Sequence, residues 1–286
     1  MDTALTLIGF GEAAGTFAAA ACWGEKARAF DIDPGRRDAM ARTLVMPSSD
    51  PQAALQNARL VLSLVTADAA LEAAQTCAPM LDRGAVWIDM NSVAPDTKRE
   101  AAKVIEQHGA KYVDAAILAP VHPARLEVPV LLAGACAADA QDALQALGFA
   151  NTSIVGSEVG RASTIKLIRS VMVKGVEALT YEMIAAAEEA GVADEVLASL
   201  EASAKSESWT TRAAYNLERM ATHGKRARAK SQDHGGELQP GPRSAPFEPD
   251  PYAHGKRVVP EGFSGHPHKR SRQPRPGNRD DGRRRA

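Results

Sequence analysis

Apolar and polar positions alternate between two patterns along the chain, and each pattern predicts one kind of element. Short runs that are apolar almost throughout, such as residues 4–10 and 59–65, predict buried strands. Segments whose apolar residues recur every three or four positions, such as 94–109, predict helices with one buried face. Buried strands that alternate with amphipathic helices indicate a mostly parallel sheet covered on both faces.

Residues 1–158 follow this alternation, and we expect them to form one Rossmann-type α/β domain. Strands are predicted at 4–10, 26–33, 59–65, 85–91, 110–118, 128–134 and 151–156. Helices are predicted at 12–24, 34–45, 50–58, 67–81, 94–109 and 139–148.

The pattern changes near residue 158, where we expect an all-helical domain, over 159–225, to begin. Residues 161–190 have no proline and predict a helix of about 30 residues, far longer than the average helix. Further helices are predicted at 193–205 and 208–226. On the long helix an apolar stripe should pack into a core, and polar residues should face a cleft or solvent. The stripe contains Ile165, Ile168, Met172, Val176, Leu179 and Met183, and the polar side contains Lys166, Ser170, Lys174, Glu177 and Tyr181.

The last segment, 226–286, has the composition of a disordered tail. It contains 9 prolines and 8 glycines and carries a net charge of +7, whereas the residues before it carry −8. Such a segment buries too little apolar surface to offset its ordering entropy. A basic tail can bind nucleic acid by charge alone, but no nucleic-acid motif accompanies it and no such partner is expected. The mixture is also typical of a GC-rich coding region read out of frame.

The cysteine content and the hydropathy exclude several classes of protein. The three cysteines are far apart and lack metal-ligand spacing, so we expect no metal site and a reducing, cytoplasmic location. No apolar run reaches the roughly 18 residues that span a bilayer, and the N-terminus lacks the basic flank of a signal peptide. We therefore expect no membrane partner.

The stretch "IGFGEAAG" predicts a dinucleotide-binding turn between the first strand and the first helix. Gly9 allows the turn, Gly11 lets the backbone approach a pyrophosphate, and Ala14 is small enough for close helix packing. The helix starting near Glu12 directs its amides at the phosphates. Asp31 ends the second strand, where a carboxylate holds the ribose hydroxyls. The alternative is a glycine-rich corner in an alanine-rich chain.

The same stretch bears on the choice between NAD and NADP. The charge of Asp31 repels a 2′-phosphate and favours NAD. Asp33, Arg36 and Arg37 keep NADP open, because either arginine is long enough to reach such a phosphate. Both arginines also fit a solvated helix.

Three more segments complete a specific set in this order: "WIDMNSVAPDTK", "DAAILAPVHPARLEVPVLLAG" and "GRASTIKLIRSVMVKGVEALTYE". Together with "IGFGEAA" they resemble the β-hydroxyacid dehydrogenase superfamily, over roughly residues 4–225. The nearest resemblance is to its phosphogluconate dehydrogenase-like branch. The resemblance implies an NAD(P)-binding Rossmann domain, a catalytic lysine on an interdomain helix, a small hydroxy-acid substrate, and a homodimer if the helical domain is competent.

Residue by residue, the resemblance places the catalytic lysine at Lys166 as general acid/base. Ser170 stands where the family has an asparagine that orients substrate, and Lys174 follows one turn later on the same face. The substrate loop reads "APVHPARLEVP" in place of a Ser/Gly-rich sequence, which leaves His122 as a candidate donor. Ser92 is the other candidate substrate contact. The predicted cofactor contacts are Gly9, Phe10, Gly11, Glu12, Ala13, Ala14, Asp31, Val65, Thr66 and Asn91.

Each of these residues also has an ordinary structural explanation. Lys166 fits a solvated helix face, Asn91 and Ser92 fit a helix cap, and His122 fits a structural loop. Two functions therefore remain open. One is an NAD(P)-dependent oxidoreductase of a small hydroxy acid, and the other is a dinucleotide-binding protein without turnover because its helical domain is truncated.

Overall fold

The computed structural model describes residues 5–204 and 207–218. Its centre is an eight-stranded sheet with the order β3-β2-β1-β4-β5-β6-β7-β8. The order 3-2-1-4-5-6 is that of the doubly wound dinucleotide-binding fold, so the predicted fold class is confirmed. The strands are β1 (Leu5–Ile8), β2 (Ala27–Phe30), β3 (Met46–Pro47), β4 (Leu60–Ser63), β5 (Val86–Asp89), β6 (Lys111–Ile117), β7 (Val130–Ala133) and β8 (Thr152–Gly156).

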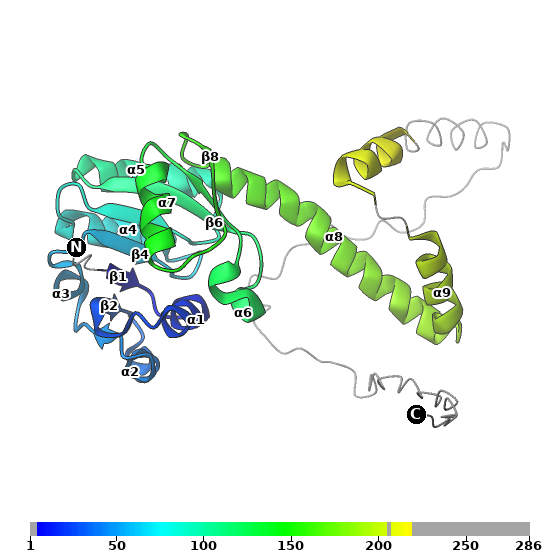
Figure 1. Ribbon diagram of the computed structural model, residues 1–286, viewed down its shortest axis with the longest axis horizontal. Helices are drawn as coiled ribbons and strands as arrows, with labels where there is room; N and C mark the ends of the chain where they lie inside the picture. The colour runs from blue at the N-terminus through cyan, green and yellow to red at the C-terminus, as the bar shows by residue number, and fades with distance from the viewer. Residues whose placement is uncertain (1–4, 205–206, 219–286) are drawn as a thin grey trace, which may run out of the picture. The chain divides into compact units, whose positions relative to one another are not determined.

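Helices cover both faces of the sheet, as the apolar strands predict (Figure 1). Side chains of successive strand residues point to opposite faces, and β4 shows this directly. Leu60 and Leu62 join the core cluster beneath α1, while Val61 joins the cluster beneath α4 and α5. These helices, with the others around the sheet, are α1 (Glu12–Ala21), α2 (Arg37–Arg42), α3 (Pro51–Leu55), α4 (Ala70–Cys77), α5 (Pro95–Gln107), α6 (Val121–Ala124) and α7 (Ala137–Ala146).

The structure adds details that the hydrophobic pattern did not predict. β7 runs antiparallel to β6, whereas the other neighbouring strands are parallel. β3 has only two residues, both exposed, and lies in a segment for which no strand was predicted. Pro34 opens a 3₁₀ turn, Pro34–Arg36, and α2 follows from Arg37. These short pieces lack the length at which periodicity becomes visible.

The long helix is present as α8 (Arg161–Glu189), followed by α9 (Ala193–Ser203), which packs against it (Figure 1). One compact unit extends to Ala204, and a second begins at Lys205. In this second unit residues 209–218 are helical. The rest of the predicted helix 208–226, and the expected tail 226–286, lie outside the described residues.

The expected packing of the α8 apolar stripe is wrong within the described part of the chain. Ile168 is 67% exposed and Leu179 is 66% exposed, Ile165, Met172 and Val176 are also exposed, and Met183 is half-buried. Ala162, Ser163 and Ala187 are the buried residues of α8. The physical reason is that no segment within residues 5–204 covers this face, so its apolar side chains keep contact with solvent.

Candidate active site

The first glycine of the motif forms a turn that only glycine accepts without strain. Gly9 has a φ of +89°, and a Cβ at this position would lie 2.5 Å from the carbonyl oxygen of Leu64. The Gly9 amide donates to the Phe30 carbonyl at 2.8 Å, which joins the ends of β1 and β2. Gly9 therefore lets three neighbouring strand ends meet at the carboxyl edge of the sheet.

The second glycine, Gly11, borders open space at the start of α1. No atom lies within 4 Å of a Cβ built on Gly11, and this residue is the N-cap of α1 without a side-chain capping bond. The first amides of α1 are therefore available to an anion. Ala14 and Phe17 on the same helix are fully buried, so α1 packs closely on the sheet. Gly15 bonds through its amide to the Gly11 carbonyl at 3.1 Å, as ordinary helix.

Asp31 supports the glycine loop directly. One carboxylate oxygen accepts from the Phe10 amide at 2.6 Å, and the other accepts from the Asp33 amide at 2.8 Å. Asp33 forms an ion pair with Arg36 at 3.4 Å. Arg36 is thus held beside a carboxylate, and two negative charges lie where the second strand ends.

A cavity of about 530 Å³ lies at this edge of the sheet. Seven of the predicted cofactor residues line it: Gly9, Gly11, Glu12, Ala13, Asp31, Val65 and Thr66. Phe10 and Ala14 are buried and do not line the cavity. Asp33 and Arg36, which bear on the choice between NAD and NADP, also line it. The sequence did not single out the other lining residues: Ile8, Phe30, Ile32, Pro51, Leu64, Ala69, Glu72, Ala73, Thr76 and Cys77. Burial raises the pKa of the Cys77 thiol to about 12, so this thiol is not a nucleophile at neutral pH.

The cavity residues fit a dinucleotide. A side chain at Gly11 would occupy the open space in front of the α1 amides, where a pyrophosphate binds in this fold. Ile32 is 85% exposed at the cavity wall and offers an apolar surface to a base. Among the described residues no group of His, Cys, Asp or Glu side chains is arranged to share a metal ion.

Asn91 lies just past the end of β5 and is almost fully buried. Its amide nitrogen Nδ2 donates to Ser63 Oγ at 2.9 Å, while its oxygen Oδ1 has no hydrogen-bond partner. A buried amide oxygen without a partner is costly, and a ligand donor would satisfy it. The structure thus places the predicted Asn91 at the same sheet edge as the cavity, although Asn91 does not line it.

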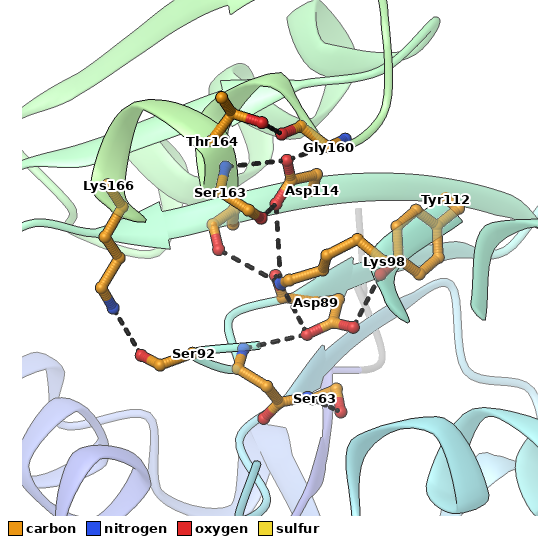
Figure 2. A network of polar contacts seen from close by, with 12 residues as sticks. Ser63, Asp89, Ser92, Lys98, Tyr112, Asp114, Gly160, Ser163, Thr164 and Lys166 are labelled. Atoms are coloured by element: carbon orange, nitrogen blue, oxygen red, sulfur yellow. Dashed lines mark hydrogen bonds and ion pairs between the residues drawn. The ribbon is translucent and has the colours of Figure 1, made fainter. Parts of the chain in front are cut away.

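Lys166 and Ser92 are brought together, although 74 positions separate them in the chain (Figure 2). The Lys166 ammonium donates to Ser92 Oγ. Burial is the main cause that lowers the pKa of Lys166 below the usual lysine value, and the charges of Lys98 and Lys174 add to it. Asp114 opposes this shift. A lysine with a lowered pKa is suited to proton transfer.

The remaining catalytic and substrate candidates have other neighbours. Ser170 donates to the carbonyl of Lys166 at 2.8 Å, within the helix, and Lys174 is exposed. The His122 ring bonds through Nε2 to Thr16 Oγ1 on α1 at 2.9 Å. The loop that carries His122 meets α8 at another point, where Arg169 donates to the Leu118 carbonyl at 3.0 Å.

A buried polar network behind Lys166 was missed by the sequence analysis (Figure 2). Asp89 and Asp114 are direct partners on the parallel strands β5 and β6, and Lys98 from α5 lies between them. Asp114 also accepts from the Gly160 and Ser163 amides at the start of α8. The network therefore attaches the helix of Lys166 to the sheet.

The sequence did contain a signal for this network. Lys98 shares one face of α5 with Ala101, Ala102 and Ile105, all of them buried. A lysine on the apolar stripe of a helix is rarely buried without a partner, and each of the two neighbouring predicted strands, 85–91 and 110–118, contains an acid.

Comparisons with known proteins agree with this geometry. A family model described as the NAD binding domain of 6-phosphogluconate dehydrogenase matches residues 5–160. A domain of unknown function, DUF1932, matches residues 187–228. The chain therefore belongs to the β-hydroxyacid dehydrogenase superfamily, and its sheet domain is an NAD-binding domain of that family.

Solved structures give relatives at several distances. A conserved hypothetical protein from Sinorhizobium meliloti 1021 is 40% identical, covering 79% of this chain and 78% of that chain, with a TM-score of 0.59. The conserved protein MTH1747, reported as similar to 3-hydroxyacid dehydrogenases, is 29% identical, with a TM-score of 0.57. That match covers 78% of this chain and 84% of MTH1747. The 3-hydroxyisobutyrate dehydrogenase of Mycobacterium tuberculosis shares the fold at 18% identity, with a TM-score of 0.63 over 73% of each chain.

A curated relative matches over a shorter part of the chain. The uncharacterized 28.5 kDa protein in the 7S RNA 5′ region of Methanothermus fervidus is 31% identical over 147 residues. That match spans 51% of this chain and 55% of the relative. In the described part of the chain, no helix is both long and apolar enough to cross a membrane.

Proposed function

We propose that the protein is an oxidoreductase that transfers hydride between a small hydroxy acid and a nicotinamide dinucleotide, with Lys166 as general acid/base. The observation that carries this proposal is the contact of Lys166 with Ser92 at the sheet edge that also holds the glycine loop. A dinucleotide site without a nearby proton acceptor would support only a cofactor-binding function.

The chemistry assigns each group one task. The bound nicotinamide supplies the hydride acceptor. Lys166, as the neutral amine, takes the hydroxyl proton as the substrate carbon loses its hydride and becomes a carbonyl carbon. In the reverse direction the Lys166 ammonium returns that proton. Ser92 holds the lysine Nζ and would hydrogen-bond the same hydroxyl.

We further propose NAD as the preferred cofactor. The carboxylates of Asp31 and Asp33 lie at the end of β2, where the ribose binds in this fold. Their charges repel a 2′-phosphate, and Arg36 is already paired with Asp33. Substrate contacts are proposed for Ser92, and for His122 if substrate binding releases its ring from Thr16.

The organisation of the chain remains a proposal as well. We keep the sheet domain at 1–158, the helical domain at 159–225 and the tail at 226–286. The exposed apolar face of α8 supports a homodimer, in which a second copy covers the stripe. A cytoplasmic location and the absence of a nucleic-acid partner stay predictions.

The second candidate is a dinucleotide-binding protein without turnover. The uncovered stripe of α8 favours it, because most of the helix that carries Lys166 is exposed within residues 5–204. The two candidates differ in one experiment. Nucleotide binding is followed by NADH fluorescence, and then a panel of small hydroxy acids is tested for cofactor reduction.

Reduction of NAD⁺ by at least one hydroxy acid supports the enzyme. Saturable NADH binding with no turnover on any acid, in either direction, supports the second candidate. A chain that binds neither NADH nor NADPH contradicts both.

A further inference from the structure

A buried lysine, Lys98, lies where two parts of the candidate active site meet. Its ammonium donates to the Asp89 carboxylate at 2.8 Å and to the Asp89 carbonyl at 2.6 Å, and it lies 3.6 Å from the Asp114 carboxylate. The whole side chain is buried. Because a charge removed from water is tolerated only when it is paired, these contacts hold the side chain in one place.

Two series of contacts begin at this ammonium. The first passes through Asp89, which accepts from the Asn91 amide at 2.9 Å, so it ends in the loop that carries Ser92. The second passes through Asp114, which accepts from the Gly160 amide at 3.0 Å and the Ser163 amide at 3.1 Å. It ends in the first turn of α8, directly before Lys166 (Figure 2).

We propose that Lys98 is a positioning residue of this site: it joins the Ser92 loop to the start of α8, and its positive charge acts on Lys166. The inference rests on the proposed function, since it concerns the residue proposed there as general base. Lys98 touches neither end of the proton transfer itself.

The charge on Lys98 has the sign that the reaction needs. A second cation near Lys166 favours the neutral amine, which is the form that accepts a proton. Lys98 and Lys174 act in this direction on the pKa of Lys166, whereas Asp114 acts against it. Lys98 also offsets part of the negative charge of Asp89 and Asp114, which would otherwise favour the ammonium.

Other ionisable groups pack around this cluster. Tyr112 on β6 donates its hydroxyl to Asp89 at 2.6 Å, and burial beside that carboxylate raises the pKa of Tyr112 well above its usual value. Tyr112 thus stays a neutral donor. Arg99 on α5 pairs with Asp96, and its guanidinium lies against Gly160. Arg99 is therefore a further cation near the start of α8.

The test measures the titration of Lys166 without substrate or cofactor. The full chain is labelled with trace acetic anhydride over a pH series, and the peptide that contains Lys166 is quantified by mass spectrometry. Lys98→Met removes the cation and should move the labelling midpoint of Lys166 upward by about one pH unit. Asp114→Asn removes the opposing charge and should move it downward.

The matched control is Lys103→Met, which removes an exposed lysine from the same helix and should leave the midpoint unchanged. Lys98→Arg, which keeps the charge, should stay closer to the parent than Lys98→Met. Hydrogen exchange over residues 160–166 should be faster in Lys98→Met and unchanged in Lys103→Met. Circular dichroism verifies that each variant is folded.

Opposite shifts in Lys98→Met and Asp114→Asn support the inference, because general loosening of the structure would move both midpoints the same way. Equal shifts, or none, overturn it. If Lys98→Met does not fold, Asp114→Asn decides alone: a downward shift supports the inference and no shift overturns it. Absence of turnover with opposite shifts in labelling would instead refute the proposed function.

Discussion

The carboxyl edge of the sheet is built in two different ways at its two ends. At β1 and α1 the edge is shaped by the backbone turn at Gly9 and Gly11, which are near one another in sequence. At β5, β6 and α8 it is held by hydrogen bonds and ion pairs between residues that lie 9 to 74 positions apart. Local backbone geometry can be deduced from glycine spacing, whereas side-chain networks depend on which strands are neighbours.

The two ends also differ in how completely the described chain encloses them. Ala14 and Phe17 on α1 are fully buried, so the helix that follows the glycine loop is packed into the hydrophobic core. α8 is held by Asp114 at its first turn, but most of its length is exposed. We therefore expect cofactor binding to survive changes that abolish turnover, and the predictions below separate the two properties.

The largest expected effect is on turnover. Lys166→Ala should lower kcat by about 10² to 10⁴ with any hydroxy acid that the parent oxidises, since it removes the proton acceptor. NADH affinity should change little, because Lys166 does not line the nucleotide cavity. Steady-state kinetics and fluorescence titration measure the two quantities, with Lys103→Ala as the surface control. A Lys166→Ala enzyme as active as the parent would sink the mechanism.

The next effect is on folding and concerns the first glycine. Gly9→Ala places a Cβ 2.5 Å from the Leu64 carbonyl at a positive φ, and should lower the free energy of unfolding by about 3 kcal/mol. Gly11→Ala has open space and should change it by less than about 0.5 kcal/mol. Urea unfolding of both variants provides the measurement. Equal losses of unfolding free energy in the two variants would contradict the positive φ and the close contact described for Gly9.

A smaller effect is expected on assembly. If a second copy covers the α8 stripe, Ile168→Glu should weaken dimerisation by about 2 kcal/mol, or roughly 30-fold, because a charge enters an apolar interface. Glu188→Lys, an exposed charge on the same helix, is the control. Sedimentation over a concentration series reports the association. A parent that stays monomeric throughout refutes the dimer.

The smallest effect is on cofactor choice. Asp31→Ser removes one carboxylate near the ribose site and should shift the NAD-to-NADP affinity ratio by about tenfold toward NADP. Fluorescence titration with NADH and NADPH measures the ratio. Glu25→Ser, in the turn before β2, serves as the control. An unchanged affinity ratio in Asp31→Ser would show that Asp31 does not determine the choice between NAD and NADP.

These differences show what the sequence could predict. The positions of β1, α1 and β2 were predicted from the sequence, because the signals of this unit are glycine spacing, a small third residue and an acid at a strand end. The long helix was predicted to within a residue or two, because it lacks breakers. The two-residue β3 carried no periodic signal. β7 was predicted as a strand, but its apolar pattern does not specify that it runs antiparallel to β6.

The second half of the site was predicted through resemblance rather than through local pattern. Lys166 and Ser92 do meet, but the reason, Lys98 between Asp89 and Asp114, requires the strand order that pairs β5 with β6. His122 was expected beside substrate, yet its ring bonds to Thr16, since the proline-rich loop folds onto α1. The packing of the α8 stripe was wrong because periodicity shows that a face is apolar but not what covers it.

The central claim is that the glycine loop holds a nicotinamide dinucleotide, and NADH fluorescence titration of the full chain tests it most directly. The account predicts saturable binding by the parent and affinity about 100-fold lower in Gly11→Val, whose side chain fills the space before the α1 amides. The unfolding midpoint of that variant should match the parent. A parent that does not bind NADH, or a Gly11→Val chain that binds equally well, would contradict the claim.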